Sequence, residues 1–393
     1  MNNDDIVIVS AQRTPTGAMG GNLGNVRSTD LGATAIRAAV SSAGIKPELV
    51  NEVIMGCVLP AGLGQAPARQ ASRGAGLPDS VACMTMNKVC GSGMKAVMLA
   101  HDLVKAGSAD VVVAGGMENM SMAPYLLPNG RFGMRMGHSQ VMDHMMLDGL
   151  EDAYGGGAMG CVAQKTSDEY GLTRADMDDF AIRSIEKAKA AVEGGAFKNE
   201  IAPVTIKDRK GETVVDTDEP PFRANVEKLP TLRPAFAKDG TLTAANSSSI
   251  SDGASAMVIM RAGDAAAQGL KPIARIVAHA TNARLPDEFT IAPIGSIEKV
   301  LAKAGWSKDD VDLYEINEAF AMVTMLAIQE LKLDANKVNV HGGACALGHP
   351  IGASGARILV TLLHALKTHG KTKGVASLCI GGGEATAIAV EAL

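Results

Sequence analysis

The sequence predicts an α/β protein built from two related βαβαβ-type halves, with a further segment inserted between them. A pattern of helix-like and strand-like stretches recurs once, about 261 residues further along the chain. Hydrophobic residues make up 47% of the chain and charged residues 20%, so a large core can be buried. The length of 393 residues, at roughly 150 per domain, indicates two or three domains.

The repeat is visible at several corresponding places. The helix, turn and strand pattern around Val50 returns around Val311, 261 residues later. Ser92-Gly93-Met94-Lys95 returns as Ser354-Gly355-Ala356-Arg357, 262 residues later. Each half then reads strand, helix, strand, helix, strand, which predicts a largely parallel sheet with helices on its faces. In a duplicated fold of this kind, loops at corresponding strand ends face one another and form the functional site.

The repeat also sets the expected domain boundaries. Residues 1–118 form the first half. A strand within about 251–271 returns to this half and completes it. Residues 272–393 form the second half. Residues 119–250 have no counterpart and are interpreted as an inserted loop domain, a lid over the site that the halves build.

Composition excludes several classes of function. The net charge is −5 without a basic block and aromatic residues are only 3%, which argues against nucleic acid as a partner. No apolar run is long enough to cross a membrane, and the first residues are acidic rather than leader-like. Six cysteines form no CxxC pair, so no metal site is expected and the thiols should be reduced in a cytoplasmic protein.

Two segments of the repeat carry candidate chemistry. Cys90 lies in a glycine-flanked turn before an apolar helix, where the helix dipole can lower a thiol pKa from about 8.5 toward neutrality. His349 lies in a glycine-dense loop before the corresponding helix of the other half, placed to act as a base or an oxyanion donor. The alternative for Cys90 is a small apolar residue at a crowded turn. The alternative for His349 is a loop histidine whose hydrogen bonds only stabilise the fold.

Three further residues follow predicted strands. Cys379 ends a strand, and the glycines after it leave room for a substrate, with the Gly381 N–H as a donor. Asn317 follows another strand and can hold a water in the site or simply cap a helix. The alternative for Cys379 is the ordinary buried apolar cysteine.

Four blocks together resemble the thiolase family along essentially the whole chain. Asn87–Lys95 resembles its nucleophile block, and three more match its NEAF, GHP and CxGGG elements: Asn317–Phe320, Gly348–Pro350 and Cys379–Gly383. The resemblance implies the duplicated thiolase fold, two βαβαβ-type halves with stacked mixed sheets plus the inserted loop domain. It also implies an acyl-enzyme on Cys90, with His349 as its base and Cys379 moving the α-proton of acetyl-CoA. Asn317 with His349, and the N–H groups of Cys90 and Gly381, would form two oxyanion sites.

The implied reaction is the reversible condensation of two acetyl-CoA to acetoacetyl-CoA and CoA, with no bound cofactor because CoA itself carries the acyl group. The alternative within the family is a broader 3-ketoacyl-CoA thiolase of fatty-acid degradation. Alternatives outside it are an inactive acyl-CoA binding protein and a decarboxylating condensing enzyme. The resemblance implies these CoA contacts: Ser248, Ala244, Ala319, Phe320, Met159 and Arg223.

Three segments depart from the biosynthetic family pattern, so acyl-chain length stays open. They are Ala158-Met159-Gly160, Phe289–Pro293 and His341-Gly342-Gly343. The resemblance further implies a homotetramer or homodimer, with Met122–Met136 as a second interface. Whether Cys90 and Cys379 form a regulatory disulfide is open, as is the physiological direction.

Overall fold

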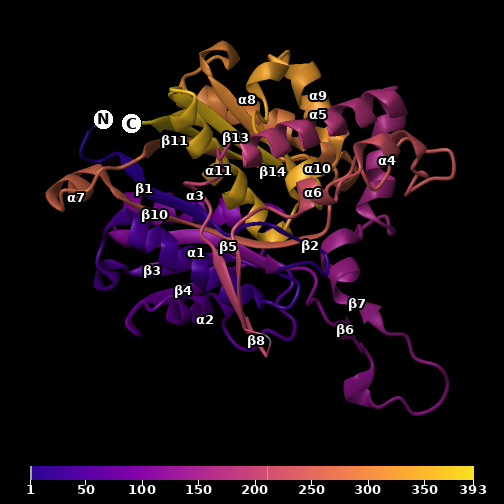
Figure 1. Cartoon of the computed structure of the whole chain (residues 1–393), viewed down its shortest axis with the longest axis horizontal. Coiled ribbons are helices and arrows are strands. Elements are labelled where there is room, and N and C mark those ends of the chain that lie inside the picture. Colours follow the sequence, from indigo (N-terminus) through magenta and orange to yellow (C-terminus); the bar gives the residue numbers. More distant parts are fainter. Residues whose placement is uncertain (1, 210) are drawn as a thin grey trace.

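The computed structural model describes residues 2–209 and 211–393 (Figure 1). The first half contains β1 (Ile6–Arg13), β2 (Gly17–Ala18), α1 (Ser28–Ala43), β3 (Glu52–Gly56), α2 (Pro67–Gly74), β4 (Ala82–Met86), α3 (Ser92–Ala106), β5 (Val111–Asn119), β10 (Ser251–Arg261) and α7 (Ala262–Ala267). The second half contains β11 (Ala274–Ala283), α8 (Ala292–Ala304), β12 (Leu313–Ile316), α9 (Ala321–Leu331), α10 (Ala344–Leu347), α11 (Ile351–Thr368), β13 (Lys373–Ile380) and β14 (Glu384–Ala392). The segment between them contains β6 (Tyr125–Leu126), β7 (Met142–Asp143), α4 (Met159–Glu169), α5 (Arg174–Glu193), β8 (Val204–Asp208), β9 (Gly211–Val215) and α6 (Pro220–Arg223).

The strand order shows the duplication directly. The large sheet runs β12-β13-β14-β11-β1-β10-β5-β3-β4, so the order β3-β5-β10-β1 of the first half matches β12-β13-β14-β11 of the second. In each half the first pair of these strands is parallel and the later pairs are antiparallel. The repeat predicted from sequence is therefore confirmed, and β10 is the returning strand expected within about 251–271.

The prediction of a largely parallel sheet is wrong, and the mixed sheet implied by the family resemblance is right. Among the named strands of the described residues, β3 pairs in parallel with β4 and β5, and β12 with β13. A three-residue turn at 381–383 leads from β13 into β14, and such a short connection forces antiparallel pairing. Two of its glycines, Gly382 and Gly383, have φ of +92° and +89°, a conformation that side-chain-bearing residues rarely adopt.

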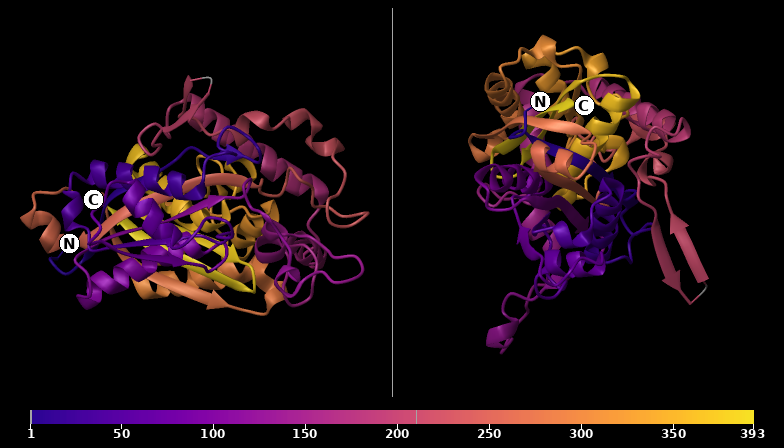
Figure 2. Two further views of the ribbon diagram at one scale, coloured as in Figure 1. Left: turned by 90° about the horizontal axis from the view of Figure 1, so that it is seen from below. Right: turned by 90° about the vertical axis from the view of Figure 1, so that its left-hand side faces the viewer.

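The helices form three layers around the two parts of the sheet (Figures 1 and 2). Helices α3 and α11 lie in the middle, where Val97 and Leu359 pack with Ile259 of β10 and with β13 and β14. The outer face of the first half is covered by α1 and α2, and that of the second by α8 and α9. Successive residues of β10 alternate between these cores, with Val258 facing α1.

Corresponding residues of the repeat meet where α3 and α11 begin. A Cβ atom on Gly355 would lie 2.6 Å from the Met94 nitrogen, and one on Gly93 would lie 3.0 Å from the Ala356 nitrogen. Only glycine permits this approach of two helix backbones. It brings the loops before the two helices, which carry Cys90 and His349, to one place.

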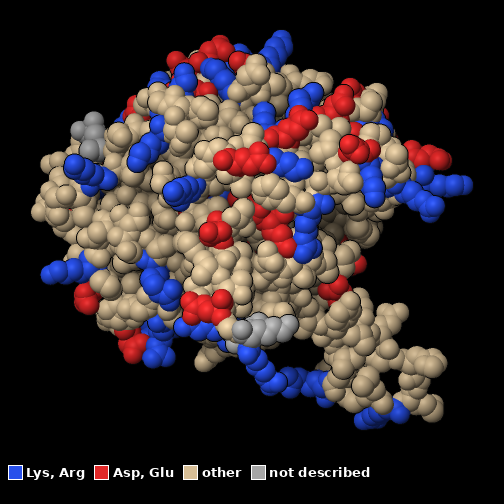
Figure 3. Space-filling view, viewed as in Figure 1, with Lys and Arg blue, Asp and Glu red and all other residues tan. Residues whose placement is uncertain are grey.

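The inserted segment both covers the second half and projects from the molecule. Helices α4 and α5 pack against α9 and α10 through a shared apolar cluster. The arm that carries β6 and β7 extends away from the body, and Figure 3 shows that most of its surface is uncharged. Among the described residues, no helix combines the length and apolar character needed to cross a membrane.

Candidate active site

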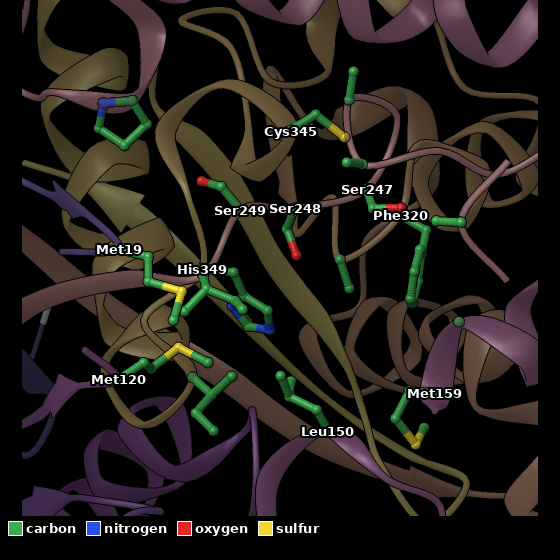
Figure 4. A pocket seen from close by; sticks show the side chains of 18 of the residues that line it. Met19, Met120, Leu150, Met159, Ser247, Ser248, Ser249, Phe320, Cys345 and His349 are labelled. Carbon is green, nitrogen blue, oxygen red and sulfur yellow. The ribbon is translucent and has the colours of Figure 1, made fainter. Parts of the chain in front are cut away.

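A cavity of about 790 Å³ opens where the two halves meet the inserted segment (Figure 4). Its wall is mostly apolar and includes Met120, Leu150 and Phe236, which sequence reasoning had not singled out. Ten of the eleven residues proposed from sequence line it: Cys90, His349, Cys379, Gly381, Ser248, Ala244, Ala319, Phe320, Met159 and Arg223. The fold thus collects into one cavity residues that lie up to 291 positions apart, from Cys90 to Gly381.

The eleventh residue, Asn317, does not line the cavity. Its side chain is buried, and neither its Oδ1 nor its Nδ2 hydrogen-bonds to any described residue. Its loop is fixed from behind by Asn339, which exchanges hydrogen bonds of 2.9 and 2.8 Å with the backbone of Ile316. Asn339 has φ of +47° and also donates to the buried Glu318. Asn317 is therefore held rigidly with two polar atoms free to bind a small polar molecule.

Cys90 lies on a strained turn at the start of α3. The preceding residue, Val89, has φ of +46°, which costs free energy in a β-branched residue. Ser92 holds the turn by accepting from the Lys88 N–H at 2.8 Å and donating to the Val89 carbonyl at 2.6 Å. The turn exposes part of Cys90 to the cavity and directs two N–H groups, its own and that of Gly381, at the sulfur.

The expectation that the helix terminus lowers the Cys90 pKa is wrong. Burial raises the pKa of the thiol to about 11, and hydrogen bonds from the N–H groups of Gly381 and Cys90 offset only part of this rise. Removing the sulfur from water disfavours the thiolate more than two backbone dipoles favour it. Burial therefore favours the neutral thiol form of Cys90.

His349 is held as a neutral imidazole with a defined tautomer. Burial, and secondarily the nearby charge of Arg357, lowers the pKa of His349 to about 3. Ser354 Oγ lies 2.6 Å from His349 Nδ1 and donates to the Pro350 carbonyl at 2.9 Å. Since a hydroxyl has one proton, the serine oxygen must accept from Nδ1–H. The other nitrogen, Nε2, then carries a lone pair, and it is buried without a protein partner.

Cys379 ends β13 and is almost completely buried. Burial raises the pKa of its thiol, and the Cys90 sulfur raises it further as a charged neighbour. The two sulfurs are therefore close enough for the charge of one to oppose the ionisation of the other. All six cysteines, including these two, are free thiols.

Glu118 is a site residue that sequence reasoning missed. At the end of β5, it accepts hydrogen bonds from the Val58, Leu59 and Gly352 N–H groups at 2.9, 3.2 and 2.9 Å. Because Gly352 belongs to the helix that follows His349, the carboxylate ties the two halves together beside the site. Burial raises the pKa of Glu118 to about 7. The sequence signal that could have found it is an acidic residue after paired glycines in each half, Glu118 in the first and Glu384 in the second.

The residues proposed to contact CoA form one side of the cavity. The Ser248 N–H donates to the Ala319 carbonyl at 2.9 Å, so the 244–248 segment runs beside the loop that carries Phe320. Phe320 packs edge-on against Phe236 and Phe289. Figure 4 shows Ser248 and His349 directed toward the space that Phe320 and Met159 border. Arg223 lies at the rim and is half-exposed, with its guanidinium 2.6 Å from Glu219.

Of the three departures from the biosynthetic pattern, two affect the cavity. Ala158 and Phe289 line it. His341 does not line it: this side chain is buried against Phe197 and faces His369, with 3.2 Å between their Nε2 atoms.

Comparisons with known proteins identify the family to which the chain belongs. Family models described as "Thiolase, N-terminal domain" and "Thiolase, C-terminal domain" match residues 6–263 and 270–392. An acetyl-CoA acetyltransferase of Cupriavidus necator is 52% identical over 389 residues, with 98% of this chain and 99% of that one covered. A probable acetyl-CoA acyltransferase of Staphylococcus aureus is 48% identical over 387 residues, with 98% of both chains covered. The crystal structure of the Bacillus anthracis acetyl-CoA acetyltransferase has a TM-score of 0.97 and 43% identity, covering 99% of each chain. The family resemblance drawn from four motifs is confirmed, and the chain belongs to the thiolase family.

Proposed function

We propose that this protein is an acetyl-CoA C-acetyltransferase, which reversibly condenses two acetyl-CoA to acetoacetyl-CoA and CoA through an acetyl group on Cys90. The observation that carries the proposal is the single cavity lined by Cys90, His349 and Cys379. Relatives at 52% and 50% identity bear the name acetyl-CoA acetyltransferase. Two thiols and a neutral imidazole supply a nucleophile, a base and a second proton carrier, which is what a condensation through an acyl-enzyme requires.

In the first half-reaction, His349 Nε2 takes the proton of the Cys90 thiol as the sulfur attacks the thioester carbon of acetyl-CoA. The free lone pair on Nε2 suits this role, because Ser354 reserves the proton for Nδ1. The N–H groups of Cys90 and Gly381 then stabilise the oxyanion. CoA leaves with the proton from His349, and the acetyl group stays on Cys90. One such donor typically contributes about 3–4 kcal/mol to transition-state stabilisation.

In the second half-reaction, Cys379 as a thiolate removes an α-proton from another acetyl-CoA, and the carbanion attacks the acetyl carbon on Cys90. The bond between that carbon and the Cys90 sulfur then breaks, acetoacetyl-CoA leaves, and Cys90 takes the proton that Cys379 carries. As an acetyl thioester Cys90 is uncharged and does not oppose the ionisation of Cys379, whose pKa is raised mainly by burial. A water held by Asn317 would donate a hydrogen bond to the enolate oxygen, and His349 would add a second one when its Nε2 carries a proton.

CoA itself would lie along the wall formed by Ser248, Ala244, Ala319 and Phe320, with Met159 near the acyl end. Arg223 at the rim would meet the nucleotide end, after exchanging its Glu219 partner for phosphate. No resident cofactor or metal enters this chemistry.

A broader 3-ketoacyl-CoA thiolase of fatty-acid degradation is the second candidate, and one observation favours it. Ala158, in one of the three segments that depart from the biosynthetic family pattern, lines the cavity, and its small side chain leaves room for a longer acyl chain. Steady-state thiolysis of 3-oxoacyl-CoAs from C4 to C16 separates the two. Acetoacetyl-CoA should have the highest kcat/KM, whereas faster cleavage of C8 or longer substrates would establish the second candidate. Lack of turnover on every chain length would reject both.

We further propose a homotetramer, or at least a homodimer, in the cytoplasm. The arm at residues 121–141 exposes large apolar side chains that a second copy could cover, among them Phe132 and Met136 at 81% and 99% exposure. Six free thiols suit a reducing compartment.

A further inference from the structure

A cluster of two histidines and one aspartate lies apart from the active site, between the two halves. His101 and Asp102 belong to α3, and His279 belongs to β11. His101 lies on the order of 15 Å along α3 from its catalytic end, because each helical residue rises about 1.5 Å. The cluster is the one group of three potential ligands with convergent donor atoms in residues 2–209 and 211–393.

Three donor atoms of this cluster form a nearly equilateral triangle. His279 Nε2 lies 2.9 Å from Asp102 Oδ1 and 3.2 Å from His101 Nδ1, and His101 Nδ1 lies 3.0 Å from Asp102 Oδ1. If both nitrogens carry a proton, each can donate to Asp102 Oδ1, but the two N–H groups then face and repel each other. If one nitrogen carries no proton, its lone pair faces the carboxylate oxygen. Hydrogen bonds alone therefore satisfy the triangle poorly.

A metal ion satisfies all three donors at once. An ion about 2.1 Å from each atom would see neighbouring ligands at roughly 90–100°, which matches one face of an octahedron. Two imidazoles and a carboxylate on one face, with the remaining positions open to water, are a recognised arrangement for divalent first-row transition metals. We propose that His101, Asp102 and His279 bind a divalent transition-metal ion.

The surroundings of the cluster support this assignment. His101 and His279 are mostly buried, at 13% and 16% side-chain exposure, which fixes their rings with interplanar angle 84°. Asp102 is 52% exposed, so an ion can enter from solvent and keep its waters. The nearby positive charge of Lys95 opposes a cation at this cluster, and the negative charge of the Asp102 carboxylate acts against it.

The choice of ion follows from the ligand types. Imidazole nitrogen suits Zn²⁺, Ni²⁺, Co²⁺ and Fe²⁺, whereas Mg²⁺ and Ca²⁺ prefer oxygen ligands throughout. The bound ion would join α3 of the first half to β11 of the second. Because it binds only the folded protein, it would raise the unfolding temperature.

The test is calorimetric titration of the full-length, tag-free and metal-free protein with Ni²⁺. We expect one ion per chain in the parent protein and at least about tenfold weaker binding in His101→Gln, His279→Gln and Asp102→Asn. His138→Gln (an exposed histidine of the arm) and His369→Gln (in the other facing histidine pair) are matched controls and should bind as the parent does. Excess Mg²⁺ should not compete.

Two readouts separate this site from the cysteines and from catalysis. Bound Co²⁺ should give weak visible bands without the intense near-ultraviolet absorption that thiolate ligands produce. Ni²⁺ should raise the unfolding temperature of the parent but not of His279→Gln, while thiolytic turnover stays the same in both. Unchanged binding in the three ligand variants, thiolate absorption of bound Co²⁺, or no binding at about 1 mM Ni²⁺ would overturn the proposal.

Discussion

At the scale of single residues, the site holds its reactive groups neutral until substrate arrives. The thiols of Cys90 and Cys379 have raised pKa values, and His349 is neutral with its Nε2 lone pair free. A neutral resting state in an apolar cavity has a chemical advantage, since a thiolate exposed there would react with oxidants and other electrophiles.

The pH dependence of alkylation tests the Cys90 pKa. Because the thiolate is the reactive form, its fraction below a pKa of about 11 rises tenfold for each pH unit. The rate of Cys90 carbamidomethylation, followed by peptide mass spectrometry, should therefore keep rising from pH 7 to 10. The exposed Cys161 serves as the internal reference for reagent access. A plateau above about pH 8 would show that the helix terminus outweighs burial after all.

Ser354 should act on catalysis through the His349 tautomer. Ser354→Ala removes the acceptor of Nδ1–H, so the imidazole can carry its proton on Nε2 and lose its function as a base. We expect kcat to fall by tenfold or more, in line with about 1–3 kcal/mol for an unsatisfied buried group, with KM little changed. Ser296→Ala, which breaks a buried serine pair elsewhere, is the matched control. Equal kcat in both variants would contradict the tautomer assignment.

At the scale of elements, strand ends and helix starts position the chemistry. The turn before α3 carries Cys90, the loop before α11 carries His349, and the end of β13 carries Cys379. The close contact of Gly93 and Gly355 with the facing helix brings the first two together. Substituting either glycine would separate the helices that hold the base and the nucleophile.

The projecting arm should control assembly rather than catalysis. Phe132→Asp together with Met136→Asp places charges on two of its most exposed apolar side chains. We expect the particle mass in light scattering to fall to half or a quarter of that of the parent protein, because an apolar interface does not tolerate buried unpaired charge. Tyr154→Asp, another exposed apolar residue outside the arm, is the control. An unchanged mass for the double variant would assign assembly to another surface.

At the scale of the whole molecule, the sequence revealed the duplication because its two copies kept corresponding glycines and turns. The duplication and the meeting of the Cys90 and His349 loops followed from those patterns, whereas the mixed sheet and the CoA-contact residues came from the family resemblance. Strand direction could not be inferred from the repeat, since the hairpin into β14 has to be recognised before the pairing is known. The direction of the Cys90 pKa shift could not be inferred from the sequence either, because desolvation of the thiol depends on the packed cavity and not on the local turn.

Glu118 and the cluster of His101, Asp102 and His279 show the same limit. Each depends on residues from separate parts of the chain that meet only in the folded protein. A sequence pattern identifies one participant, such as the acid after paired glycines, but not its partners. Long-range polar contacts are therefore the part of this site that a single sequence leaves undetermined.

The most direct test of the two-cysteine mechanism is mass spectrometry of enzyme mixed with acetyl-CoA alone, for the parent, Cys90→Ser and Cys379→Ser. The account predicts one acetyl group on Cys90 in Cys379→Ser, which should accumulate because the second half-reaction is blocked. Cys90→Ser should carry no acetyl group. An acetyl group found on Cys379, or normal condensation by Cys379→Ser, would contradict the assignment of Cys90 as nucleophile and Cys379 as the carrier of the α-proton.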